Sequence, residues 1–171
     1  MAEPTLRSAS RRRLLLAAAA LLAGCGFRPR GMAGLGAPTV QINNVARGSP
    51  LGQTISRRLA GSETQWVDPP QQADIRLDVL SYREERDILT LTKAGKVQEY
   101  LIRARLNFRV LDKEGKEVIP PTELVAERDY SYDDNQITAR AQEEALLYAD
   151  MRQQLVDQMF LMVGRTLANR K

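Results

Sequence analysis

The side chains that could carry chemistry are few in this 171-residue chain, and the types that are missing exclude whole classes of reaction. The chain has no histidine, and Cys25 is its only cysteine. Because histidine is the commonest general base and metal ligand, a Ser-His-Asp triad cannot be built. The sequence also has no glycine-rich phosphate loop, zinc-ligand spacing or nucleophile elbow. We therefore expect a protein that is not an enzyme, with no catalytic residue, metal or cofactor.

Paired acids are the remaining catalytic candidates: Glu84-Glu85, Asp133-Asp134 and Glu143-Glu144. Two catalytic carboxylates must converge on one site. Neighbouring side chains instead point to opposite faces of a strand, or diverge by about 100° around a helix. We interpret these pairs as solvated surface and helix-cap acids, so a hydrolase that uses carboxylates alone is the weakest functional alternative.

A row of arginines could bind an anionic ligand or the wall of a partner protein. Arg103, Arg105 and Arg109 share one face of the alternating run 99–111. They could equally form a ladder of cross-strand ion pairs, since Asp74 and Asp78 occupy the polar face of a neighbouring run. The pattern alone leaves both alternatives open.

Two lysines flank a predicted hairpin turn, the tetrapeptide "KAGK" at 93–96. Lys93 and Lys96 would project ammonium groups from the end of a long hairpin, where they could contact anions. The alternative is that they only keep the turn solvated. A second turn of similar composition, "KEGK", follows at 113–116.

The elements that must position these residues follow from periodicity. Alternation predicts strands at 39–42, 74–82, 99–111 and 122–132, with the charged stretch "REERD" (83–87) interrupting the second run before Ile88 and Leu89. A capped helix is predicted at 50–60, between Ser49 and Gly61, and a second helix at 137–164, after the capping residues 133–135. The order β-α-β-β-β-α predicts an α+β two-layer sandwich, with both helices on one face of a four-stranded, mostly antiparallel sheet.

The N-terminal segment has the layout of an export signal. Four arginines precede an apolar run (14–22) that is too short to cross a bilayer, which takes roughly 20 residues. The tetrapeptide Leu22-Ala23-Gly24-Cys25 resembles the bacterial lipobox. That resemblance implies cleavage after residue 24, with diacylglycerol on the Cys25 sulfur and an acyl chain on its amine. Two or more chains are what stable anchoring requires.

Loss of this segment lowers the net charge from +4 to about +1, so nothing favours a nucleic-acid partner. We assign 1–24 as a lipoprotein signal peptide, 25–37 as the lipidated N-terminus and a glycine-rich tether, and 38–168 as a single domain.

Three motifs together resemble the LptE family of lipopolysaccharide-assembly lipoproteins: "CGFRPRG" (25–31), "AGKVQEY" (94–100) and "ARAQEEALLYADMRQQL" (139–155). The resemblance implies two helices on a four-stranded sheet. It also implies an anchor on the periplasmic face of the outer membrane, to which Gly26 rather than Asp after the cysteine is suited. The implied partners are the barrel translocon LptD, which such proteins plug one to one and help to assemble, and lipopolysaccharide itself.

The same resemblance carries the family's basic positions onto Lys93 and Arg140. With Lys96, these are the candidate lipopolysaccharide-binding residues. Lysine lacks the planar guanidinium that grips a phosphate with two hydrogen bonds. The alternative function is that of an auxiliary periplasmic lipoprotein of another lipid-transport system, of the ABC type, which would co-purify with an inner-membrane complex instead of a barrel.

Overall fold

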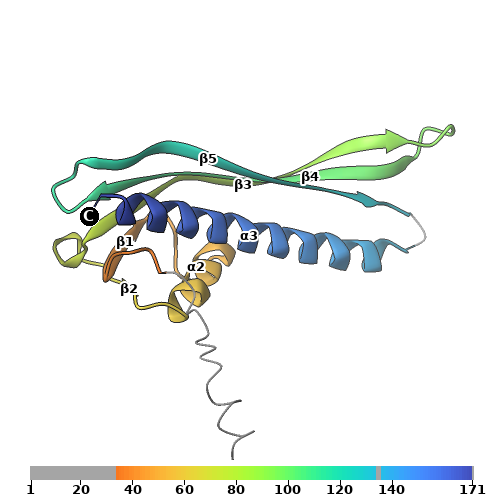
Figure 1. The fold of residues 1–171 in the computed structure, drawn as a ribbon. Helices are drawn as coiled ribbons and strands as arrows, with labels where there is room; N and C mark the ends of the chain where they lie inside the picture. The colour runs from red at the N-terminus through yellow and green to blue at the C-terminus, as the bar shows by residue number, and fades with distance from the viewer. Residues whose placement is uncertain (1–33, 134–135, 171) are drawn as a thin grey trace, which may run out of the picture. The chain divides into compact units, whose positions relative to one another are not determined.

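Two helices lie on one side of a five-stranded sheet in the computed structural model, which describes residues 34–133 and 136–170 (Figure 1). The predicted α+β fold class is confirmed, with one strand more than the four we expected. The predicted signal peptide and Cys25 lie outside the described residues.

The sheet has the order β2-β1-β3-β4-β5 and is mixed. Its strands are β1 (Thr39–Asn43), β2 (Gln65–Trp66), β3 (Ile75–Leu91), β4 (Val97–Asp112) and β5 (Glu117–Ser131). The central strand β3 pairs antiparallel with β4, as β4 does with β5, whereas β1 is parallel to both of its neighbours. The additional strand, β2, has two residues, which is too short for alternation to reveal it.

The first helix, α2 (Pro50–Ala60), has the predicted signals at both ends. The Ser49 hydroxyl accepts a hydrogen bond from the Gly52 amide at 3.0 Å, and Gly61 ends the helix. A 3₁₀ turn, η1 (Pro70–Gln72), leads into β3. The long helix, α3 (Ile137–Ala168), runs four residues beyond its predicted end. Its N-cap is Gln136, which makes no side-chain capping bond; of the expected caps, residues 134 and 135 lie outside the described residues.

Two strands, β3 and β5, differ most from their predicted bounds. β3 runs unbroken through "REERD", so the predicted interruption is wrong. β5 begins at Glu117, five residues early, and contains Pro120 and Pro121. A proline cannot donate to a strand ladder, but β5 is an edge strand, and its register against β4 shifts beside these prolines, between the pairs Phe108–Thr122 and Val110–Ile119.

The apolar core occupies one half of the length of α3. All the buried residues of this helix lie between Met151 and Val163, where they pack with buried residues of α2, β1, β3, β4 and β5. Leu35 and Ala37, in the segment we assigned to the tether, are also buried, and Leu35 is fully inaccessible to solvent. Ordered packing therefore begins by residue 35.

Candidate functional site

The hairpin between β3 and β4 projects beyond the rest of the sheet (Figure 1). The last pair between β4 and β5 is Glu99–Ser131, whereas β3 and β4 stay paired as far as Leu91–Val97. The turn is closed by a hydrogen bond of 2.7 Å from the Thr92 amide to the Lys96 carbonyl. We call residues 88–98 the hairpin tip.

Lys93 and Lys96 are both exposed in this tip. Gly95 has a φ of 77°, a left-handed conformation that glycine adopts at little cost, and it allows the tight turn that presents the two lysines. The tip contains no acidic residue. It is therefore a basic surface whose own sequence supplies no neutralising charge.

Arg140 lies in the first turns of α3, and α3 begins at the same end of the sheet as the hairpin tip (Figure 1). Its guanidinium donates to the carboxylate of Glu143, one turn along the helix, at 2.7 Å. The three basic candidates thus occupy one end of the domain. Arg140 differs from Lys93 because part of its charge is already engaged.

The arginine row on β4 is a ladder of ion pairs. Arg103 contacts Asp87 on β3 at 2.5 Å and Glu127 on β5 at 2.7 Å. The hydrogen bond to Glu127 is the main cause of the raised pKa of Arg103. Arg105 and Arg109 are paired in the same way, Arg105 with Glu85 at 3.5 Å and Glu123 at 3.4 Å, and Arg109 with Asp78 at 2.9 Å. Of the two alternatives we left open, the geometry is that of the cross-strand ladder.

A second polar cluster lies between the sheet and α3, and sequence reasoning missed it. After a register shift at Leu80, β3 points Tyr82, Glu84 and Arg86 toward the helix layer, opposite Leu106, Ala104 and Ile102 of β4. These polar residues meet Glu144, Tyr148 and Arg152 of α3, which are spaced i, i+4, i+8 and so share one helix face. We call this cluster the interlayer clamp.

The contacts of the clamp are specific. Glu144 accepts hydrogen bonds from Arg86, at 2.9 Å, and from the hydroxyl of Tyr130 on β5. Tyr148 donates to the backbone carbonyl of Glu85 at 2.8 Å, and Arg152 pairs with Glu84. Desolvation is the main cause that raises the pKa of Tyr130, and of Tyr148, to about 12. The signal available in the sequence was a charged run inside an alternating strand, because two of its residues, Glu84 and Arg86, fall on the core face.

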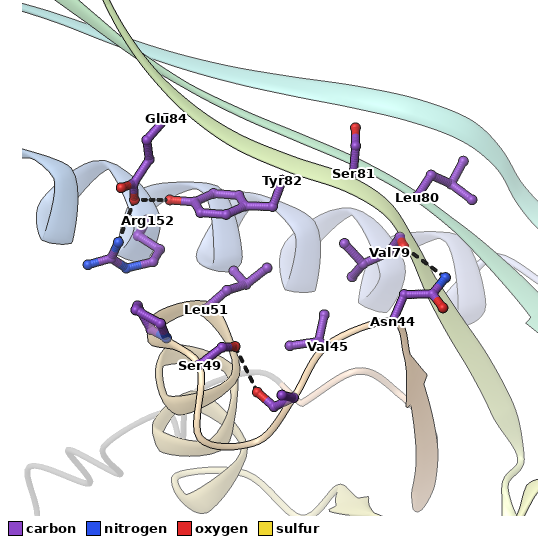
Figure 2. A pocket seen from close by; sticks show the side chains of 12 residues that line it. Asn44, Val45, Ser49, Leu51, Val79, Leu80, Ser81, Tyr82, Glu84 and Arg152 are labelled. Atoms are coloured by element: carbon purple, nitrogen blue, oxygen red, sulfur yellow. Dashed lines mark hydrogen bonds and ion pairs between the residues drawn. The ribbon is translucent and has the colours of Figure 1, made fainter.

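One end of the clamp forms the wall of a surface pocket of about 320 Å³ (Figure 2). The loop between β1 and α2 lines one side, where Asn44 donates to the Val79 carbonyl at 3.1 Å. On the other side Glu84 accepts from the Tyr82 hydroxyl and pairs with Arg152 (Figure 2). These polar groups satisfy one another, and the pocket lining contains no cysteine or histidine. Its geometry is that of a structural junction between α2, α3 and β3.

Neither a metal centre nor a membrane-crossing helix is present in the part of the chain that the structure describes. No group of three or more acidic, cysteine or histidine side chains is placed to hold a metal ion in residues 34–133 and 136–170. Over the same ranges, no helix is long and apolar enough to cross a bilayer.

Fold and site together define a small α+β module of the type found in bacterial lipoproteins. Lipoprotein B from Nitrosomonas europaea is 27% identical, with a TM-score of 0.67 over 79% of this chain and 88% of that one. A minor lipoprotein from Acinetobacter baumannii is 26% identical, with a TM-score of 0.61 over 78% and 92%. Rare lipoprotein B from Shewanella oneidensis shares the fold, with a TM-score of 0.68 at 24% identity over 77% and 97%.

The particular family is shown by sequence. Residues 37–163 match the family model described as LptE, lipopolysaccharide-assembly. The LPS-assembly lipoprotein LptE of Pectobacterium atrosepticum is 31% identical over 152 residues, which cover 85% of this chain and 80% of that protein. The chain belongs to the LptE family of lipopolysaccharide-assembly proteins, which are not enzymes, and the resemblance we noted in three motifs is confirmed.

Proposed function

We propose that this protein is an outer-membrane lipoprotein that plugs the LptD barrel, assists its assembly and binds lipopolysaccharide on its way to the cell surface. Family membership supports a role in lipopolysaccharide assembly. The observation that carries the binding role is the hairpin tip, with two exposed lysines and no acid in its eleven residues.

The chemistry of binding is electrostatic. The lipid A and inner-core phosphates of lipopolysaccharide carry clustered negative charge, normally bridged by divalent cations. The Lys93 and Lys96 ammonium groups and the Arg140 guanidinium can replace those cations as partners of the phosphates. Such replacement would separate single molecules from an aggregate. Since Arg140 is shared with Glu143, we expect Lys93 to contribute more than Arg140.

The outer face of the sheet is suited to the inside of a barrel. Interiors of outer-membrane barrels are polar. The ladder of Arg103, Arg105 and Arg109 presents charges that are already paired, so the face is hydrophilic without a strong excess of either sign. A folded plug with this surface can be enclosed without burying unpaired charge.

In this proposal the protein is anchored by lipid on Cys25. One copy of it associates with one barrel. Mass spectrometry of protein extracted from membranes should show residue 25 as the N-terminus, with diacylglycerol and a further acyl chain. An unmodified Cys25, or an intact leader, would contradict the anchor.

Charge reversal at the tip tests the binding role. Lys93→Asp with Arg140→Asp should weaken binding of purified lipopolysaccharide at least tenfold and leave co-purification with the barrel unchanged. The matched control is Lys113→Asp with Lys116→Asp, because these lysines occupy the other hairpin turn, beside Glu114. Equal binding by the tip variant and the control would remove Lys93 and Arg140 from the mechanism. Co-purification with an inner-membrane complex in place of a barrel would favour the alternative function in another lipid-transport system.

A further inference from the structure

Large apolar side chains are exposed on the same hairpin tip that carries the lysines. Ile88, Leu89 and Leu91 are 57%, 47% and 55% exposed. Among residues 34–133 and 136–170, eight large hydrophobic residues are exposed, and these three fall within four consecutive positions. Single exposed leucines are ordinary, but a cluster of this kind indicates a surface that is covered by something else.

The local backbone explains why the domain cannot cover them itself. The register of β3 against β4 shifts twice here, between Ile88 and Thr90 and between Thr90 and Leu91, so Leu89 is an extra residue in the ladder. β5 ends at Ser131, opposite Glu99, and supplies no neighbour further along the hairpin. The core closes with an aromatic cluster, in which Tyr100 stacks on Tyr130 at 5.7 Å between ring centres. Beyond this cluster the hairpin tip is without a covering layer among the described residues.

Apolar and basic groups therefore lie next to one another on one narrow projection. Lys93 and Lys96 follow the apolar residues by two to eight positions, and the tip has no acidic residue. A segment that combines exposed apolar area with cationic groups is suited to the boundary between anionic head groups and acyl chains. A protein partner with a polar, balanced surface would leave the apolar side chains without contacts.

We propose that the hairpin tip inserts Ile88, Leu89 and Leu91 among the acyl chains of lipopolysaccharide while Lys93 and Lys96 lie at its phosphates. This inference rests on the proposed function and extends it, since the ligand is recognised through its fatty acyl chains as well as its charge. The tip therefore discriminates an acylated anion from a phosphorylated sugar of the same charge.

Two probes separate these contributions: rough lipopolysaccharide, and the phosphorylated oligosaccharide left after its complete deacylation. The variant is Leu89→Gln with Leu91→Gln in the full chain. The matched control is Leu146→Gln with Leu161→Gln, because these leucines are 72% and 46% exposed on α3. Both pairs are exposed, so both variants should keep the thermal midpoint of the parent protein.

The parent protein should bind intact lipopolysaccharide more tightly than the oligosaccharide. Leu89→Gln with Leu91→Gln should weaken binding of the intact form by about tenfold, from the apolar area lost, and leave oligosaccharide binding unchanged. The control should match the parent protein on both probes.

Parental binding of intact lipopolysaccharide by the variant Leu89→Gln with Leu91→Gln would overturn the inference alone. If that variant also lost its association with the barrel or with itself, the result would show that a protein covers the tip. A parent protein that binds neither probe would refute the binding role itself, together with this extension of it.

Discussion

Replacing Glu144 should loosen the N-terminal half of α3 from the sheet and leave the C-terminal half packed. Its carboxylate accepts from Arg86 on β3 at 2.9 Å and from the Tyr130 hydroxyl on β5, and it is 19% exposed. Because no residue of α3 before Met151 is buried, this clamp supplies much of what holds the N-terminal half of the helix to the sheet. That half carries Arg140. Glu144→Ala therefore tests whether polar contacts position the ligand-binding end.

The magnitude follows from the burial of the partners left behind. Glu144→Ala removes the acceptor of the Tyr130 hydroxyl, in a residue that is 5% exposed, and leaves Arg86 with no carboxylate at that position. Hydrogen bonds to a charged group contribute about 1.5–3 kcal/mol each, and less where solvent can replace them, so we expect a loss of about 2 kcal/mol. In a domain of this size that lowers the melting temperature by roughly 6–10 °C.

The matched control is the neighbouring residue, Glu143→Ala. Its carboxylate is 45% exposed and pairs only with Arg140 on the same helix in the contacts described, so the expected loss is about 0.5 kcal/mol or less. Hydrogen exchange supplies the local measurement. Glu144→Ala should speed exchange across residues 137–148 and leave residues 151–163 slow, since those pack in the core.

A double-mutant cycle with Tyr130→Phe should give a coupling energy of about 1 kcal/mol between the two positions. The reasoning would be refuted by equal losses for Glu143→Ala and Glu144→Ala, or by unchanged exchange in the first half of α3.

Three further outcomes follow from local geometry. The pKa of Tyr130 is raised to about 12, so it binds its proton more tightly when folded; stability should fall as the pH rises from about 10 to 12, and urea titrations should show a smaller fall for Tyr130→Phe. Gly52→Ala would place a methyl group 2.1 Å from a backbone oxygen of the preceding loop and should cost more than about 2 kcal/mol in urea unfolding, whereas Gly48→Ala, with nothing within 4 Å, should cost under about 1. Arg109→Ala leaves the 6%-exposed Asp78 without its closest cation and should cost about 1–2 kcal/mol, recovered in part by Asp78→Asn in the double variant.

Elements with a regular period could be predicted from sequence because burial imposes that period. Leu51, Ile55 and Leu59 of α2 are buried as their spacing indicates. In β4 the apolar positions from Ile102 to Val110 are all inaccessible, and the arginines between them face the other way. The residues of "KAGK" and "KEGK" mark both turns, since the glycines take positive φ.

The prediction failed where both faces of a strand are polar. Residues 83–87 place Glu84 and Arg86 against a helix that supplies Arg152 and Glu144, contacts 58 and 68 residues away in sequence. Alternation of hydrophobicity cannot reveal such a strand, because both faces are charged. The same long separation explains why sequence alone left two interpretations of the arginine row: its partners, such as Glu127, lie on another strand.

The candidate site was predictable in its charges and not in its apolar part. Lys93 and Lys96 were identified from the turn that they flank. We predicted that the second alternating run continues through Ile88 and Leu89, and nothing in the sequence indicates the two register shifts beside them. Burial is a property of the layers, and here β5 ends before it can shield the hairpin.

The two hairpin turns have the same backbone and opposite surroundings, and this separates folding from function. In each, an amide donates across the turn to a lysine carbonyl, Thr92 to Lys96 at 2.7 Å and Asp112 to Lys116 at 2.9 Å. In each, the backbone amide of that lysine donates a hydrogen bond to a side-chain oxygen of the first turn residue, Thr92 at 3.1 Å and Asp112 at 2.8 Å. An acidic side chain at the first position closes the second turn at least as well as threonine closes the first.

Turn geometry therefore does not require the hairpin tip to be free of acids. The second turn contains Asp112 and Glu114, and Lys113 lies 3.7 Å from the Glu114 carboxylate. The turn at the tip contains no acidic residue of its own, and exposed apolar side chains precede it in the sequence. Since neither feature stabilises the hairpin, a ligand that is both anionic and apolar is the simplest physical reason for their coincidence.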